Sequence, residues 1–102
     1  MFRCTPALPH FCANIHVGCA GRSKQKTSAF DAVFHMGRAS VTFANGKGWA
    51  AEVSNSRGAL ILRKSDARDW IRIETDGRYA QRIYAESGPL MAYGHCNHQK
   101  AS

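Results

Sequence analysis

Apolar side chains alternate with polar ones from Ala39 almost to the end of the chain, and this two-residue period constrains the fold more than any other feature. Gly, Asn, Asp and Ser interrupt the alternation at short intervals, as expected for tight turns. We predict turns at residues 45–47, 55–58, 65–68, 75–77 and 87–89. The pattern indicates short antiparallel strands joined in chain order, which is a β-meander.

The chemistry of each turn predicts how the neighbouring strands pair. Gly77 suits the left-handed position of a three-residue hairpin loop, and Gly58 suits the fourth position of a type I turn. The turns together predict these facing residues: Phe43 with Trp49, Val53 with Leu60, Leu62 with Ile71, Ile73 with Tyr79, and Ile71 with Gln81. A slip of one residue would move a strand's apolar side chains to the opposite face of the sheet.

These registers gather the large apolar side chains on one face of the sheet. That face is the predicted core, and it consists of Val41, Phe43, Trp49, Ala51, Val53, Leu60, Leu62, Ile71, Ile73, Tyr79 and Ile83.

Residues 28–36 are predicted to form a short helix over this face. Phe30, Val33 and Phe34 have helical spacing, and Gly37 suits the left-handed residue that ends a helix. Phe30, Ala32 and Phe34 also alternate as in a strand, but we favour the helix. The expected fold class is therefore α+β: an antiparallel β-meander of about five to six strands over residues 39–94, covered by the helix at 28–36, or a barrel-like variant.

The first 27 residues lack clear periodicity and are rich in Pro, Cys, His and basic side chains. We expect them to form an irregular basic segment ahead of a single β-meander domain at residues 28–102, since 102 residues fit one domain. No apolar run approaches the ~20 residues that a membrane-spanning helix needs. A membrane partner is therefore not expected.

The four cysteines are Cys4, Cys12, Cys19 and Cys96. They allow three disulfide pairings, and the sequence does not choose among them. Prolines and polar residues make the N-terminus a poor secretory signal. A cytoplasmic location with free thiols is the default expectation, with a Cys19–Cys96 disulfide as the alternative for an exported chain.

A structural zinc ion is the one cofactor that the sequence suggests. Cys12, His16 and Cys19 share helical spacing, and Cys96 or His98 would complete a tetrahedral set. The spacing matches no zinc-finger pattern, because no two cysteines are separated by two intervening residues. Isolated cysteines and exposed tail histidines explain the same residues.

The opposite face of the sheet carries a basic and aromatic group. The predicted registers place Trp70 between Arg63 and Arg82, with Arg72 and Tyr84 on the same face. Such a surface can stack bases and neutralise phosphates. Arginine stems that merely cover an aromatic side chain on a half-exposed sheet are the structural alternative.

The overall charge favours a polyanionic partner. Fourteen Lys and Arg residues face seven Asp and Glu, for a formal charge of +7. Lys24 and Lys26 lie in a basic linker that can follow a phosphate backbone. We therefore expect a small non-enzymatic module that binds nucleic acid, preferably single-stranded, through Arg63, Trp70, Arg72, Arg82, Tyr84, Lys24 and Lys26.

Two alternatives remain open. The chain can be a protein-interaction module, such as an inhibitor or adaptor encoded by a phage or mobile element, that docks on an acidic or nucleic-acid-binding protein. It can also be a metal-free ribonuclease-like toxin that uses residues of the types found at His35, Arg78, Tyr79, Arg82 and His95. No catalytic motif connects these residues, so no catalytic residue is assigned. The sequence does not indicate an oligomeric state.

Overall fold

The computed structural model describes residues 1–13, 21–65, 68–85 and 88–98, and within these ranges every regular element is a β-strand. No helix in this part of the chain is long and apolar enough to cross a membrane. The strands are β1 (Phe2–Pro6), β2 (His10–Cys12), β3 (Arg22–Lys26), β4 (Phe30–His35), β5 (Arg38–Phe43), β6 (Gly48–Ser56), β7 (Ala59–Lys64), β8 (Trp70–Ile73), β9 (Arg78–Ala85) and β10 (Gly88–His98).

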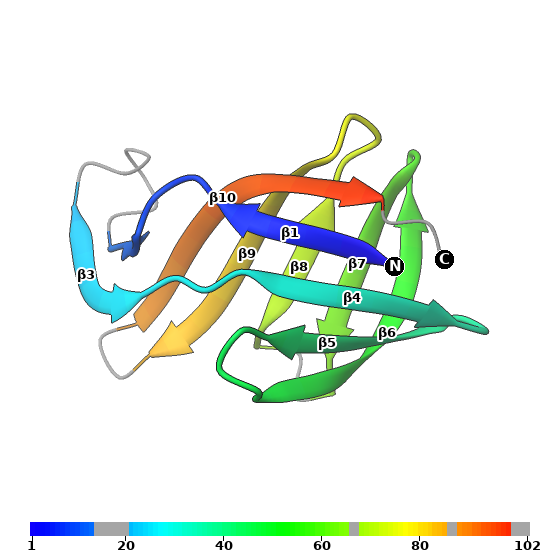
Figure 1. Cartoon of the computed structure of the whole chain (residues 1–102), viewed down its shortest axis with the longest axis horizontal. Coiled ribbons are helices and arrows are strands. Elements are labelled where there is room, and N and C mark those ends of the chain that lie inside the picture. Colours follow the sequence, from blue (N-terminus) through cyan, green and yellow to red (C-terminus); the bar gives the residue numbers. More distant parts are fainter. Residues whose placement is uncertain (14–20, 66–67, 86–87, 99–102) are drawn as a thin grey trace.

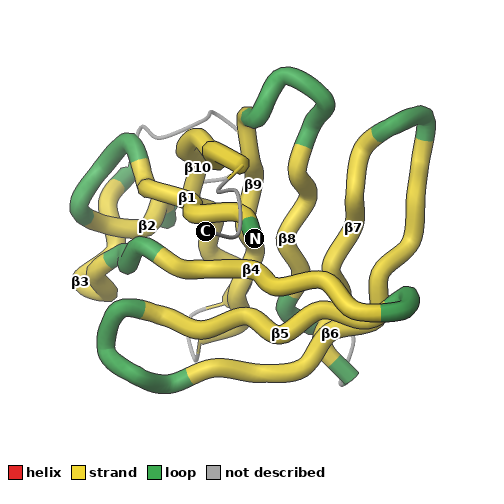
Figure 2. The backbone as a smooth tube through the Cα atoms, turned by 45° about the vertical axis from the view of Figure 1, so that its right-hand side comes forward, coloured by secondary structure: helices red, strands yellow, loops and turns green. Residues whose placement is uncertain are grey.

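Eight of these strands form a closed antiparallel barrel. Strands β4 to β10 pair in chain order, and β1 lies between β4 and β10, so that the sheet returns on itself. Figure 1 shows β1 in blue beside both β4 and β10. The short strands β2 and β3 extend the sheet from the other part of the long β10, to one side of the barrel (Figure 2).

The predicted α+β class is wrong, because residues 30–35 form the strand β4 instead of a covering helix. Phe30 and Ala32 are buried inside the barrel while Val33 is exposed, which is the alternation of a strand. Met36 and Gly37 both have positive φ, so they form a two-residue hairpin turn and not a helix end. As a strand, β4 gains hydrogen-bonding partners on both sides, whereas a helix this short is marginal on its own.

Strands β5 to β10 pair antiparallel in chain order as predicted, but they belong to a closed barrel and not to an open meander, and two of the predicted registers are displaced. Val41 faces Trp49, and Val53 faces Leu62. The β6–β7 turn consists of Arg57 and Gly58, both at positive φ, so it is not of type I and lies one position further along the chain than the predicted turn. Each displacement is two residues, so every side chain keeps its predicted face.

The registers predicted for β7, β8 and β9 are confirmed. Leu62 faces Ile71, Ile73 faces Tyr79, and Gln81 faces Ile71. Gly77 has a φ of 93°, as the three-residue loop between β8 and β9 requires. The Glu74 amide donates to the Arg78 carbonyl oxygen at 2.8 Å and closes this loop.

The N-terminal segment, expected to be irregular, contributes three strands. β1 is only five residues long, too short for its alternation to be recognised in the sequence. Its register sets Cys4 opposite Cys96 on β10 and opposite Phe30 on β4. The short helix assumed for the zinc ligands is absent at His10–Cys12, which is β2, and residues 14–20 lie outside the described part.

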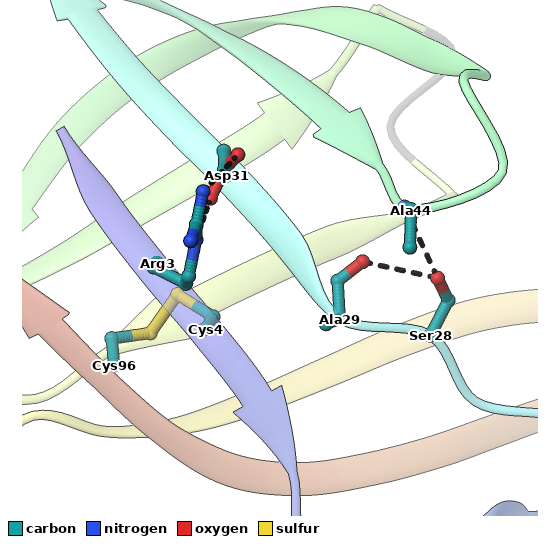
Figure 3. Close-up of polar contacts among 7 residues, drawn as sticks. All are labelled: Arg3, Cys4, Ser28, Ala29, Asp31, Ala44 and Cys96. Carbon is teal, nitrogen blue, oxygen red and sulfur yellow. Dashed lines mark hydrogen bonds and ion pairs between the residues drawn. A yellow bond between two sulfur atoms is a disulfide. The ribbon is translucent and has the colours of Figure 1, made fainter.

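Covalent and ionic contacts hold β1 on both of its sides, as Figure 3 shows. The Cys4–Cys96 disulfide joins β1 to β10 across 92 sequence positions. On the other side, the Arg3 guanidinium binds the Asp31 carboxylate of β4, with Nε to Oδ1 at 2.9 Å. This exposed ion pair lowers the pKa of Asp31, chiefly through the hydrogen bond from Arg3. The chain therefore closes its barrel by tying its first strand to its last.

The core fills most of the barrel interior. Leu62, Ile71 and Cys4 are fully buried. A series of ring contacts crosses this core: Tyr79 to Phe30 at 5.1 Å, Phe30 to Phe43 at 5.7 Å, and Phe43 to Trp49 at 6.5 Å between centroids. Aromatic pairs at these separations attract one another beyond the effect of their buried area. The predicted core face is thus the inside of the barrel.

We predict that the disulfide is a major source of stability. The variant Cys4→Ala/Cys96→Ala should lower the free energy of unfolding by about 3–5 kcal/mol, because the bridge restricts a long loop in the unfolded chain. Denaturation in guanidinium chloride measures the change. Arg3→Gln, on the same strand, removes only an exposed ion pair and should change stability little. A loss below about 1 kcal/mol in the double alanine variant would contradict this role of the disulfide.

Candidate functional site

The arginine–tryptophan patch is the group of predicted site residues that the structure brings together on the outside of the barrel. We define it as Arg63, Trp70, Arg72, Arg82 and Tyr84. Arg63 on β7 faces Trp70 on β8, and Trp70 faces Arg82 on β9, so the three side chains form one row across three strands. The patch arises because β7, β8 and β9 pair in registers that place these residues opposite one another.

Arg82 is the central side chain of this patch. Its guanidinium carbon lies 5.3 Å from the ring centroid of Trp70 and 5.3 Å from that of Tyr84. Its Nε also donates to the Arg68 carbonyl oxygen at 3.1 Å. These contacts hold the cation between two rings. Trp70 is half-buried, whereas 47% of Tyr84 is exposed, so Tyr84 offers the more accessible ring.

Acidic side chains reduce the positive field of the patch. Arg72 Nε contacts Glu74 Oε1 at 2.6 Å, and Glu52 on β6 is the cross-strand partner of Arg63. Asp69 accepts a hydrogen bond from the Tyr84 amide at 3.0 Å and thereby anchors the segment before β8 to β9. Arg72 is therefore already neutralised in part.

Lys24 and Lys26, predicted to belong to the same site, do not lie on this face. Both are exposed on β3, which is separated from β9 by β10 and β2 in the sheet. Lys26 lines a cavity at the end of the barrel. The two lysines therefore form no continuous surface with the arginine–tryptophan patch.

The predicted zinc ligands are not available as a thiolate set. Cys96 is bonded to Cys4, and Cys12 is also disulfide-bonded. An oxidised cysteine has no thiolate to give to zinc. His16 and Cys19 lie outside the described residues. Among the residues that the structure does describe, no group of three or more His, Cys, Asp or Glu side chains is placed to hold a metal ion. The predicted Cys19–Cys96 pairing is excluded, because Cys96 already has its partner.

The residue types considered for ribonuclease chemistry are only partly assembled. Arg78 and His95 are direct cross-strand partners, and both line an outer groove of about 540 Å³ with Glu74. Tyr79 borders the same groove but is buried in the core, and its hydroxyl is buried and has no hydrogen-bond partner among the described residues. Burial raises its pKa well above the ordinary value.

The two histidines of that hypothesis lie far apart. Cys96, the residue after His95, is the cross-strand partner of Cys4, and Cys4 is in turn the partner of Phe30 on β4. His35 is five residues further along β4, which corresponds to about 17 Å at ~3.3 Å per residue. A pair of histidines acting as acid and base on one substrate is therefore not formed.

Sequence reasoning missed a cavity at the end of the barrel where the β5–β6 and β7–β8 turns lie. Its volume is about 360 Å³, and Gln81 lines it. The sequence did contain a signal, because the predicted register placed the polar Gln81 on the apolar inner face. Gln81 is indeed inside, with only 3% of its surface exposed.

No protein-family model matches this chain, and neither the curated proteins nor the solved structures include a match. Inference about function therefore rests on the residues of this chain alone.

Asp76 gives a testable pH dependence in the loop beside the outer groove. Its carboxylate accepts the Arg78 amide at 3.0 Å and Arg78 Nε at 2.7 Å. The backbone hydrogen bond is the larger cause of a pKa below the ordinary 3.8. Asp76 therefore stabilises the fold fully above that ordinary value, and its contribution is lost as the pH falls through the lower folded-state pKa.

An NMR titration of the Asp76 carboxyl carbon measures this pKa. The Arg78→Gln variant keeps the backbone amide, which is the largest single cause, so the pKa should rise but stay below the ordinary value. A return to the ordinary pKa in that variant would show that the side chain, and not the backbone, causes the shift.

Proposed function

We propose that this chain is a small non-enzymatic module that binds single-stranded nucleic acid through the arginine–tryptophan patch. The observation that carries the proposal is the stacking of Arg82 on both Trp70 and Tyr84. These contacts place a cation beside an exposed ring on the outer face of the barrel. A nucleotide presents the matching groups, which are a flat base and a phosphate.

Each side chain has a separate part in this proposal. Tyr84 provides the exposed ring on which a base stacks, a contact worth about 1–3 kcal/mol per base. Arg63 and Arg82 contact phosphates. Trp70 holds the Arg82 guanidinium in position through the cation–π contact between them. Arg72 is secondary, since Glu74 already binds its Nε at 2.6 Å.

The cysteine chemistry bears on where such a module would work. A cytoplasmic location was expected only because free thiols were the default. Cys4 and Cys96 form a buried disulfide, and bonds of this kind persist in oxidising surroundings. We therefore propose that the chain works in an oxidising compartment.

Binding to a fluorescently labelled single-stranded oligonucleotide at low salt tests the proposal. We predict that Tyr84→Ala weakens binding by about 5- to 100-fold, because a stacked base loses its partner. Arg63→Gln should weaken binding and reduce the slope of log affinity against log salt by about 0.7, the value for one phosphate contact on a single strand.

Arg57→Gln is the matched control, because it removes one positive charge from the β6–β7 turn, away from the patch. It should bind nearly as the native chain does. An unchanged affinity in Tyr84→Ala, or an equal loss in Arg57→Gln and Arg63→Gln, would show that only net charge matters and would reject the site.

The protein-interaction alternative predicts a different result. A module that docks on an acidic protein would fail to bind the oligonucleotide at any salt concentration. It would keep one protein partner in a nuclease-treated lysate and lose that partner in Arg63→Gln.

A further inference from the structure

The cavity at the barrel end is a second site that the nucleic-acid proposal does not use. Residues of the β5–β6 turn and of the segment between β7 and β8 line it, together with Phe11 on β2 and Lys26 on β3. An eight-stranded barrel is just wide enough to be filled by side chains or to hold one small ligand. Here the core fills the remainder of the interior, and a space of about 360 Å³ is left at this end.

The inner wall of the cavity is largely aromatic. It is formed by the apolar side chains Phe11, Phe43, Trp49 and Ile83. Phe43 and Trp49 lie in ring contact with each other, and Phe43 packs on the buried Phe30. The wall is therefore supported by the core, and its size places the cavity near the lower end of the range for small-molecule sites.

Gln81 provides a polar group within this apolar wall. Only 3% of its surface is exposed, and its side chain makes no hydrogen bond among the described residues. Its amide still has access to the cavity, because Tyr79 Oη is the one described side-chain polar atom that is fully buried without a partner. The amide is presented to the cavity, where a ligand group can satisfy it.

Cations gather at the entrance. Lys26 comes from β3, Lys47 from the β5–β6 turn, and Lys64 from the end of β7. Among the residues that the structure describes, Asp69 is the one acid in the lining, and its Oδ2 lies 4.0 Å from Lys64 Nζ. No ion pair involves Lys26 or Lys47 within the part of the chain that the structure describes. The entrance therefore favours a negatively charged group on the ligand.

The local structure holds these groups in place. The Ser28 hydroxyl, which also lines the cavity, donates to the Ala29 carbonyl oxygen at 3.0 Å and accepts the Ala44 amide at 3.3 Å (Figure 3). The Asn45 side chain accepts the Lys47 amide at 2.9 Å. The turn that carries Lys47 is thus fixed to the segment that follows Lys26.

We infer that this cavity binds a small aromatic monocarboxylate that carries a hydroxyl group. The aromatic ring lies against Phe43 and Trp49. The carboxylate lies at the entrance beside Lys26 and Lys47, and the hydroxyl hydrogen-bonds the Gln81 amide deeper inside. The three ligand groups correspond to the three kinds of lining: ring, cation and amide.

Three related compounds test each part of the inference. They are 3-(4-hydroxyphenyl)propionate, 3-phenylpropionate, which lacks the hydroxyl, and 3-(4-hydroxyphenyl)propan-1-ol, which lacks the carboxylate. Titration is followed by ¹H–¹⁵N NMR of the native chain. We predict saturable shifts of the Trp49 indole and the Gln81 amide signals with the first compound, while the Trp70 indole, on the outer face, stays unchanged.

The other two compounds should bind more weakly, each by about 2- to 10-fold, which corresponds to one hydrogen bond or exposed charge contact. Gln81→Leu should remove the preference for the hydroxyl but keep that for the carboxylate. Lys26→Gln/Lys47→Gln should do the reverse. Arg22→Gln/Arg57→Gln, which removes two charges outside the cavity lining, should bind as the native chain does.

Equal binding of all three compounds, shifts confined to Trp70 and Tyr84, or no shift at millimolar concentration would overturn the inference. The oligonucleotide experiment involves none of these variants of Gln81 or Lys47, so failure of one proposal leaves the other standing.

Discussion

The insertion of β1 between β4 and β10 is the interaction on which the rest of the structure depends. Without it, β4 and β10 would each present an unpaired edge, and the sheet would stay open. The strand is short, and it is held by backbone pairing on both sides, by the Cys4–Cys96 bond and by the Arg3–Asp31 ion pair. β1 and β10 approach each other so closely at this junction that position 94 requires glycine, because a Cβ atom there would collide with the Thr5 carbonyl oxygen and the Tyr79 ring.

Closure of the barrel gives each strand face its role. The inward face must fill a fixed space, and the unfilled end leaves Gln81 and Trp49 beside a cavity. The outward face is free to carry polar and aromatic groups, and cross-strand pairing assembles Arg63, Trp70 and Arg82 into one row. The two proposed sites therefore lie on opposite sides of the same sheet and use different residues.

The sequence predicted the strand faces well and the closure poorly. Alternation and turn chemistry are local, so they placed Leu62, Ile71 and Tyr79 inside and Trp70 outside. The two displaced registers did not change which side chains face the core, because a shift of two residues keeps each side chain on the same face of the sheet. Closure depends on β1 and β4, whose partners are distant in sequence, and the apolar residues of 30–34 fit helical and strand periods equally. The pairing of Cys4 with Cys96 likewise follows from the three-dimensional register and not from spacing.

The most direct test of this account is a set of nuclear Overhauser contacts across β1 in the folded chain. The closed barrel predicts contacts from Cys4 both to Cys96 on β10 and to Phe30 on β4, with backbone amides of β1 that exchange slowly with solvent. Contacts on one side only, or rapidly exchanging β1 amides, would show an open sheet and would remove the basis for the cavity.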